Sequence, residues 1–145
     1  MVTKPYLLDV NVLIALAWPQ HVHHLRSHAW FDALTDAWAT TPFTEAGYLR
    51  LSMNAAVVGS SIRASEAIAS LSAIRALPRH VFLIDDSSLA RAAIVTDRMS
   101  SYRQVTDAHL VNLAATTGAV LATLDRAIVE LLAPDEREHV FLLPG

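Results

Sequence analysis

The chain has 145 residues, of which 53% are hydrophobic and 17% are charged. These values predict a single folded domain over residues 1–145 with a substantial apolar core, and they exclude a disordered chain. Cysteine is absent, which excludes a disulfide framework and a thiolate metal site. The formal net charge of −3 excludes nucleic-acid binding by bulk positive charge, so any such binding needs local arginines or a bound cation.

No apolar run approaches the roughly 20 residues that span a bilayer, so we expect no membrane association. Asp9 and Asn11 interrupt the apolar stretch near the N-terminus, which argues against a secretion signal. Together with the lack of cysteine, these features predict a cytoplasmic protein.

Apolar runs and the helical spacing of apolar side chains place strands and helices along the chain. In order, we expect a strand at 6–8, helices at 11–16 and about 23–36, a strand at 37–41, helices at 44–54 and 62–77, a strand at 81–84, helices at 89–96 and 108–117, a strand at 119–124, a helix at 127–132 and a strand at 140–143. The polar segments 54–61, 97–103 and 134–138 are expected to be loops.

Capping residues mark several of these boundaries. Pro19 and Pro78 end helices, Gly118 follows one, and Thr44 is the expected N-cap of the helix that carries Glu45. Short apolar strands alternating with helices predict an α/β protein, in which both faces of a central, mainly parallel sheet are covered.

Four acidic residues stand where strands end or helices begin. Asp9 lies between two apolar runs, Asp125 follows a predicted strand, and Glu45 and Asp107 each lie in the first turn of a predicted helix. The carboxyl ends of parallel strands share one edge of a sheet, so these side chains can converge although they are far apart in the chain. Clustered carboxylates repel one another, and a divalent cation such as Mg²⁺ relieves that repulsion through oxygen ligands.

Each acid also has a purely structural interpretation. Asp107 and Glu45 could be ordinary first-turn acids, and Asp125 could simply cap the helix that follows it. Asp9 is the hardest to explain in this way, because burial of an unpaired charge is costly. The joint pattern of the four acids is what favours a metal site.

This pattern resembles the PIN-domain family and, within it, the bacterial VapC-type toxins of toxin–antitoxin pairs. The segments that carry the resemblance are Leu8–Leu16, Thr44-Glu45, Val105–Leu110 with Leu113-Ala114, and Leu121–Asp125. The resemblance implies a three-layer α/β/α sandwich and Mg²⁺- or Mn²⁺-dependent endoribonuclease activity. It implies an acidic set with two supporting polar residues, namely Asp9, Glu45, Asp107 and Asp125 with Asn11 and Thr123. It also implies an RNA substrate, a cognate antitoxin that occupies the groove, and a toxin homodimer.

Roles follow for the four acids. We expect Asp9 and Asp107 to bind the metal most directly, with Asp125 as a further ligand or acting through water. Glu45 would orient a water or act as the general base. Attack of the activated water on a backbone phosphorus would release a 3′-hydroxyl and a 5′-phosphate.

Other polar residues near these segments leave alternatives open. The spacing of His21, His23 and His24 allows a zinc site, although the sequence offers no further ligand and no cysteine. His109, two residues after Asp107, either faces the site or packs beneath it. Three arginines either contact RNA phosphates or form a solvated rim, and these are Arg98, Arg103 and Arg126.

Other α/β proteins also carry acids at strand ends. A receiver domain needs a lysine at a late strand end, but Lys4 is the only lysine of the chain. A haloacid-dehalogenase-type phosphatase needs an aspartate where this chain has Asn11. The alternatives that stay open are a non-catalytic PIN-like nucleic-acid-binding domain and a DNA-directed PIN-like nuclease.

Overall fold

The sheet in the computed structural model, which describes residues 3–145, has five strands that all run parallel. The strands are β1 (Tyr6–Leu8), β2 (Trp38–Thr40), β3 (His80–Phe82), β4 (Val120–Thr123) and β5 (Val140–Leu142). Their order across the sheet is β3-β2-β1-β4-β5, so β1 is central and lies between β2 and β4. Because the strands are parallel, the segments that follow β1, β2 and β4 leave the sheet at the same edge.

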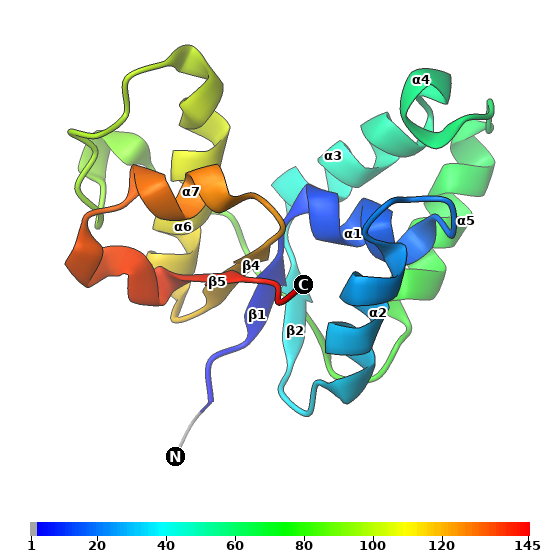
Figure 1. Ribbon diagram of the computed structural model, residues 1–145, viewed down its shortest axis with the longest axis horizontal. Helices are drawn as coiled ribbons and strands as arrows, with labels where there is room; N and C mark the ends of the chain where they lie inside the picture. The colour runs from blue at the N-terminus through cyan, green and yellow to red at the C-terminus, as the bar shows by residue number, and fades with distance from the viewer. Residues whose placement is uncertain (1–2) are drawn as a thin grey trace.

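Helices cover both faces of this sheet (Figure 1). One face packs Leu7 and Leu121 against α6 (Val105–Thr117) and α7 (Arg126–Leu131). The opposite face packs Leu8 against four helices, namely α1 (Val10–Ala17), α2 (His24–Ala33), α3 (Pro42–Ser52) and α5 (Ala64–Arg75). Neighbouring strand residues therefore enter two separate cores, as the alternation of side chains along a strand requires. The predicted α/β/α sandwich is confirmed.

The third helix begins earlier than predicted. Its N-cap is Thr41 and its first residue is Pro42, whereas the sequence pattern pointed to Thr44 as the cap. The Thr44 hydroxyl instead accepts a hydrogen bond from the Thr41 backbone N–H at 3.1 Å, which closes the first turn. Proline suits the first helical position because the N–H that it lacks would have no partner there.

The helix predicted over residues 89–96 is wrong. Only a 3-10 turn, η1 (Leu89–Arg91), forms in this segment. After it, the Ala93 N–H donates to Asn112 Oδ1 at 2.8 Å, and the Val95 N–H donates to Glu136 Oε1 at 2.9 Å. Side chains from other elements thus take the backbone donors that a helix would have used.

Three segments expected to be loops contain short helical turns. They are α4 (Ala55–Val58), η2 (Tyr102–Gln104) and η3 (Pro134–His139). Gly118 ends α6 in the left-handed conformation, at φ +71°, as the sequence predicted. Among residues 3–145, no helix is long and apolar enough to cross a membrane.

Candidate active site

Asp9 occupies the junction between β1 and α1. Its side chain caps α1, with Oδ1 accepting a hydrogen bond from the Val10 N–H at 2.7 Å. Its other oxygen, Oδ2, accepts from the Thr123 hydroxyl at 2.7 Å. The residue is only 6% exposed, so a carboxylate at the centre of the sheet edge is both buried and fixed in orientation.

Asn11 and Thr123 tie the end of β4 to this junction. The Asn11 amide nitrogen donates to Thr123 Oγ1 at 3.3 Å, and Asn11 Oδ1 accepts from the Leu124 N–H at 3.2 Å. Thr123 Oγ1 also accepts from the Asp125 N–H at 3.0 Å. The two polar residues to which the family resemblance gave a supporting role therefore hold the segment before Asp125 against Asp9.

Electrostatic interactions connect three of the four predicted acids. Burial, together with the charges of Asp9 and Asp125, raises the pKa of Asp107 to about 6. Burial also raises the pKa of Asp9, against the lowering effect of its bonds to Thr123 and Val10, and the charge of Asp125 adds to the rise. Asp125 is exposed and caps α7, accepting from the Ala127 N–H at 2.9 Å.

Glu45 is bound on a different side of α3. Its Oε2 accepts from the Thr40 hydroxyl at 2.7 Å, and its Oε1 accepts from the Arg75 guanidinium at 3.4 Å. The Thr40 hydroxyl also lies 2.7 Å from His80 Nε2. The structure thus places the fourth predicted acid in a network with β2, β3 and α5, and neither of these two bonds involves one of the three aspartates.

A pocket of about 420 Å³ opens beside Asp9 and Asp107. Its walls come from the start of α1, from α3 and from the first turns of α6, and Arg50 is the one basic residue among those that line it. A larger pocket of about 600 Å³ lies between α2 and the C-terminal residues, and it contains none of the predicted site residues.

The chemistry of the pocket suits a hard cation. In the described part of the chain, no lysine, arginine or histidine forms an ion pair with Asp9, Asp107 or Asp125. Within residues 3–145, no three His, Cys, Asp or Glu side chains are grouped closely enough to hold one metal ion together. Mg²⁺ is commonly bound through one or two carboxylates, with water completing its shell, so two aspartates with unpaired charge fit that ion.

The histidines that suggested zinc lie at the other end of α1. His24 Nδ1 is 2.7 Å from the Ala15 carbonyl oxygen, and His28 Nε2 is 2.9 Å from that of Leu16. These rings cap carbonyls that the last turn of a helix leaves without partners. Burial lowers the pKa of His21, and the neighbouring His23 and His24 lower it further. Of the three histidines that suggested zinc, His24 therefore caps the helix end, whereas His21 Nδ1 accepts a hydrogen bond from the His23 backbone N–H at 3.0 Å.

Two residues of the pocket wall were missed by the reasoning from sequence. Phe43 and Arg50 lie on the same face of α3 and both line the pocket. Their spacing is a signal that could have found them, because residues seven apart share a helix face. His109 does not line the pocket but contacts this wall, since its ring meets that of Phe43 at 5.8 Å between centroids.

Fold and site together define an α/β domain with an acidic pocket at the carboxyl edge of a parallel sheet. The model of the PIN-domain family matches residues 6–131 of this chain. The chain belongs to the PIN-domain family.

Similar proteins agree with this assignment. Ribonuclease VapC39 of Mycobacterium tuberculosis is 48% identical over 126 residues, which cover 86% of this chain and 91% of that protein. Ribonuclease VapC38 of the same organism is 46% identical over 138 residues, covering 94% and 96%. The crystal structure of PAE2754 from Pyrobaculum aerophilum is similar in fold, with a TM-score of 0.55 at 22% identity over 89% of this chain and 80% of that chain.

Proposed function

We propose that this chain is a metal-dependent endoribonuclease toxin of a type II toxin–antitoxin pair. The observation that carries the proposal is the pair of Asp9 and Asp107, which line one pocket. Asp9 is buried, and its charge helps to raise the pKa of Asp107. Among the described residues, neither acid has a basic ion-pair partner. The relatives that are named ribonucleases support RNA as the substrate. An enzyme of this kind acts in the cytoplasm, where its RNA is.

We assign Mg²⁺, or Mn²⁺ in its place, to Asp9 and Asp107, with Asp125 acting through water. When bound, the cation supplies a water of lowered pKa and neutralises the charge that builds on phosphorus. The chain supplies the geometry: the Thr123 hydroxyl and the Val10 N–H orient the two oxygens of Asp9. Fixed partners of this kind preset the direction of a ligand before the metal arrives.

Glu45 is our proposed general base, which takes the proton from the attacking water and so assists release of the 3′-hydroxyl and 5′-phosphate products. This role requires its carboxylate to leave Thr40 and Arg75 and turn toward the pocket when RNA is bound. Glu45→Gln should then lower cleavage at least about 100-fold, the low end of what general-base catalysis contributes. The thermal stabilisation by Mg²⁺ should stay, because Glu45 is not a metal ligand. Glu130→Gln, at an exposed position of α7, is the matched control.

The main test is incubation of purified protein with RNA and with DNA, each with Mg²⁺ and with EDTA. We expect cleavage of RNA that EDTA stops and no cleavage of DNA. Cleavage of DNA would support the DNA-directed alternative. Absence of cleavage together with retained RNA binding would support a non-catalytic PIN-like domain.

Two partners belong to the proposal. A cognate antitoxin, encoded by a neighbouring small open reading frame, should bind the purified chain and stop RNA cleavage.

A second copy of the chain should complete a homodimer, which analytical ultracentrifugation would detect as a doubled mass. A monomer at all concentrations would remove the dimer from the proposal without affecting the nuclease assignment.

A further inference from the structure

One face of α3 runs directly past the acidic pocket. Phe43, Gly47 and Arg50 share this face and all three line the pocket with Asp9 and Asp107. At 1.5 Å per residue, Phe43 and Arg50 are about 10 Å apart along the helix axis. Gly47 lies about midway between them, so the α3 wall of the pocket has an aromatic ring at one end and a guanidinium at the other.

Gly47 brings this face close to the acids. A Cβ atom added at Gly47 would lie 2.7 Å from Val10 Cγ2, so α3 contacts the start of α1 at the residue next to Asp9. A larger side chain would separate the two helices there. The close approach is what places Phe43 and Arg50 on either side of the pocket.

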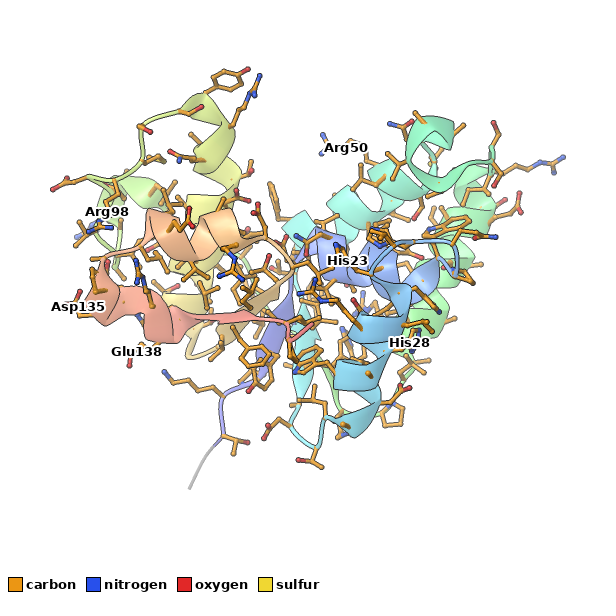
Figure 2. All side chains as sticks on the ribbon, in the orientation of Figure 1. His23, His28, Arg50, Arg98, Asp135 and Glu138 are labelled. Carbon is orange, nitrogen blue, oxygen red and sulfur yellow. The ribbon has the colours of Figure 1, made fainter. Side chains whose placement is uncertain are left out.

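Arg50 has its charge free for a ligand. It is exposed, and within the described residues it forms no ion pair. Figure 2 shows its side chain projecting from α3 on the side of the molecule where α6 lies. A phosphate is the ligand that fits, because an arginine binds it with two parallel hydrogen bonds and the neighbouring aspartates would repel it without such a partner.

The Phe43 ring is partly exposed and is supported by a neighbouring ring. Phe43 is 37% exposed, unlike Tyr48 on the buried side of α3, which is 1% exposed. Its ring meets the His109 ring at 61°, and His109 Nε2 lies 2.8 Å from Asp85 Oδ2. Asp85 thus orients His109, and His109 supports one side of the Phe43 ring. An exposed, supported aromatic ring in a groove that also carries a positive charge is the arrangement that proteins use to stack the bases of single-stranded nucleic acid.

We propose that Phe43 and Arg50 form two substrate subsites, one on each side of the acids. A base of single-stranded RNA stacks on Phe43, a backbone phosphate binds Arg50, and the phosphodiester between them faces Asp9 and Asp107. A duplex does not fit this arrangement because its bases expose no free face for stacking. This inference rests on the proposed ribonuclease function, and it adds the two residues that position the strand.

The test measures binding and cleavage separately. Binding is measured by fluorescence anisotropy with a fluorescein-labelled single-stranded RNA of about 12 nucleotides, a length within the range of single-strand sites. The protein carries Asp107→Asn so that the RNA stays intact. Into this background we introduce Arg50→Gln, Phe43→Leu and Phe43→Tyr, with Arg63→Gln as the matched control, because Arg63 is exposed and does not line the pocket. Cleavage is measured with the same four substitutions in the wild-type chain.

We expect Arg50→Gln to flatten the dependence of log Kd on log salt by about 0.7, the contribution of one phosphate contact on a single strand. Phe43→Leu should weaken binding about tenfold, and Phe43→Tyr should keep it, because stacking needs an aromatic ring and not bulk alone. In the cleaving protein both losses should raise KM more than they lower kcat. Arg63→Gln should change neither Kd, KM nor the salt dependence.

The subsite proposal is overturned if Arg50→Gln and Phe43→Leu bind and cleave RNA like the wild type while the wild type cleaves RNA. It is also overturned if the annealed duplex binds as tightly as the single strand. A wild-type chain that cleaves no RNA with either metal contradicts the ribonuclease function instead. In that case the two subsites would still be supported by a flatter dependence of log Kd on log salt in Arg50→Gln, and by weaker RNA binding in Phe43→Leu than in Phe43→Tyr.

Discussion

Asp9 shows how opposing effects are balanced at a single residue. Burial favours its protonated form, whereas hydrogen bonds from Thr123 and Val10 favour the carboxylate. Burial of a carboxylate costs free energy that an apolar residue at this position would not cost. The presence of an aspartate here therefore indicates that a negative charge is needed at this place. The predictions at this scale concern what each charge does for metal binding and for stability.

Asp9→Asn should remove Mg²⁺-dependent cleavage and leave the fold intact. Thr123 Oγ1 already accepts two hydrogen bonds, so its hydroxyl must donate to the amide oxygen at position 9, and the bond from Val10 is then lost. One lost hydrogen bond costs about 1 kcal/mol, and relief of the buried charge offsets it. Loss of an outer partner of a metal ligand costs up to about 100-fold, and Asp9 is proposed to bind the metal itself, so we expect cleavage to fall at least about 100-fold. Asp97→Asn, at an exposed position, is the control, and full activity in Asp9→Asn would contradict the metal site.

Asp107 makes the metal-free protein sensitive to pH. Its pKa in the folded chain, about 6, is above the ordinary aspartate value of 3.8, so the folded state holds the proton more tightly than the unfolded state. The stability that this proton gives is present in full at low pH and is lost as pH rises through about 6. In EDTA, Asp107→Asn should therefore raise the melting temperature relative to wild type more at pH 7 than at pH 5. A difference that does not change with pH would contradict this.

At the scale of elements, the contact between α1 and α3 decides the shape of the pocket. Gly47 lets the two helices approach beside Asp9, and the same contact orients the face of α3 that carries Phe43 and Arg50. Glycine is a poor helix former, so its presence in α3 indicates that the close approach outweighs its conformational cost.

Gly47→Ala tests this contact in a double-mutant cycle with Val10→Ala. In the wild-type background the new Cβ would meet Val10, and overpacking should outweigh the gain in helix propensity, for a net loss of about 1 kcal/mol in the free energy of unfolding. In the Val10→Ala background the space is free, and the same change should stabilise the chain by about 1 kcal/mol. Urea denaturation measures both effects. Equal effects in the two backgrounds would show that the helices do not meet at this point.

At the scale of the whole molecule, the parallel sheet brings acidic residues from distant parts of the chain close together at one edge. Asp9 follows β1, Asp125 follows β4, and Asp107 lies in the first turn of α6, the helix that leads into β4. The repulsion among these carboxylates is spread over three segments, so a cation bound at Asp9 and Asp107 should strengthen the whole fold and not one loop alone.

Mg²⁺ should raise the melting temperature of the chain at pH 7, because a ligand that binds only the folded state stabilises it. The rise should be smaller at pH 5, since Asp107 is then protonated and offers the ion less charge. Asp9→Asn should abolish the rise at both pH values. Differential scanning fluorimetry over a range of Mg²⁺ concentrations makes the measurement, and an equal rise in wild type and Asp9→Asn would place the ion elsewhere.

Much of this architecture follows from local sequence patterns. The strand before Asp9 and the helix ended by Gly118 are set by apolar runs and by a residue suited to left-handed backbone. Segment 89–96 has a helical pattern, yet Asn112 and Glu136 capture its backbone donors. Those partners lie far along the chain, and a local pattern contains no information about them.

The sequence by itself determined the strand–helix alternation, the family, and which acids stand at the ends of strands, because these depend on residue type and local spacing. Only the tertiary structure decided that three aspartates share one electrostatic environment while Glu45 bonds to Thr40 and Arg75, and that Phe43 and Arg50 flank the pocket. For the aspartates the physical reason is the parallel sheet, which brings the ends of β1 and β4 to one edge. For Glu45, Phe43 and Arg50 it is the rotation of α3 about its axis. That rotation is fixed by the packing of Gly47 on Val10, a contact between residues that are distant in the chain.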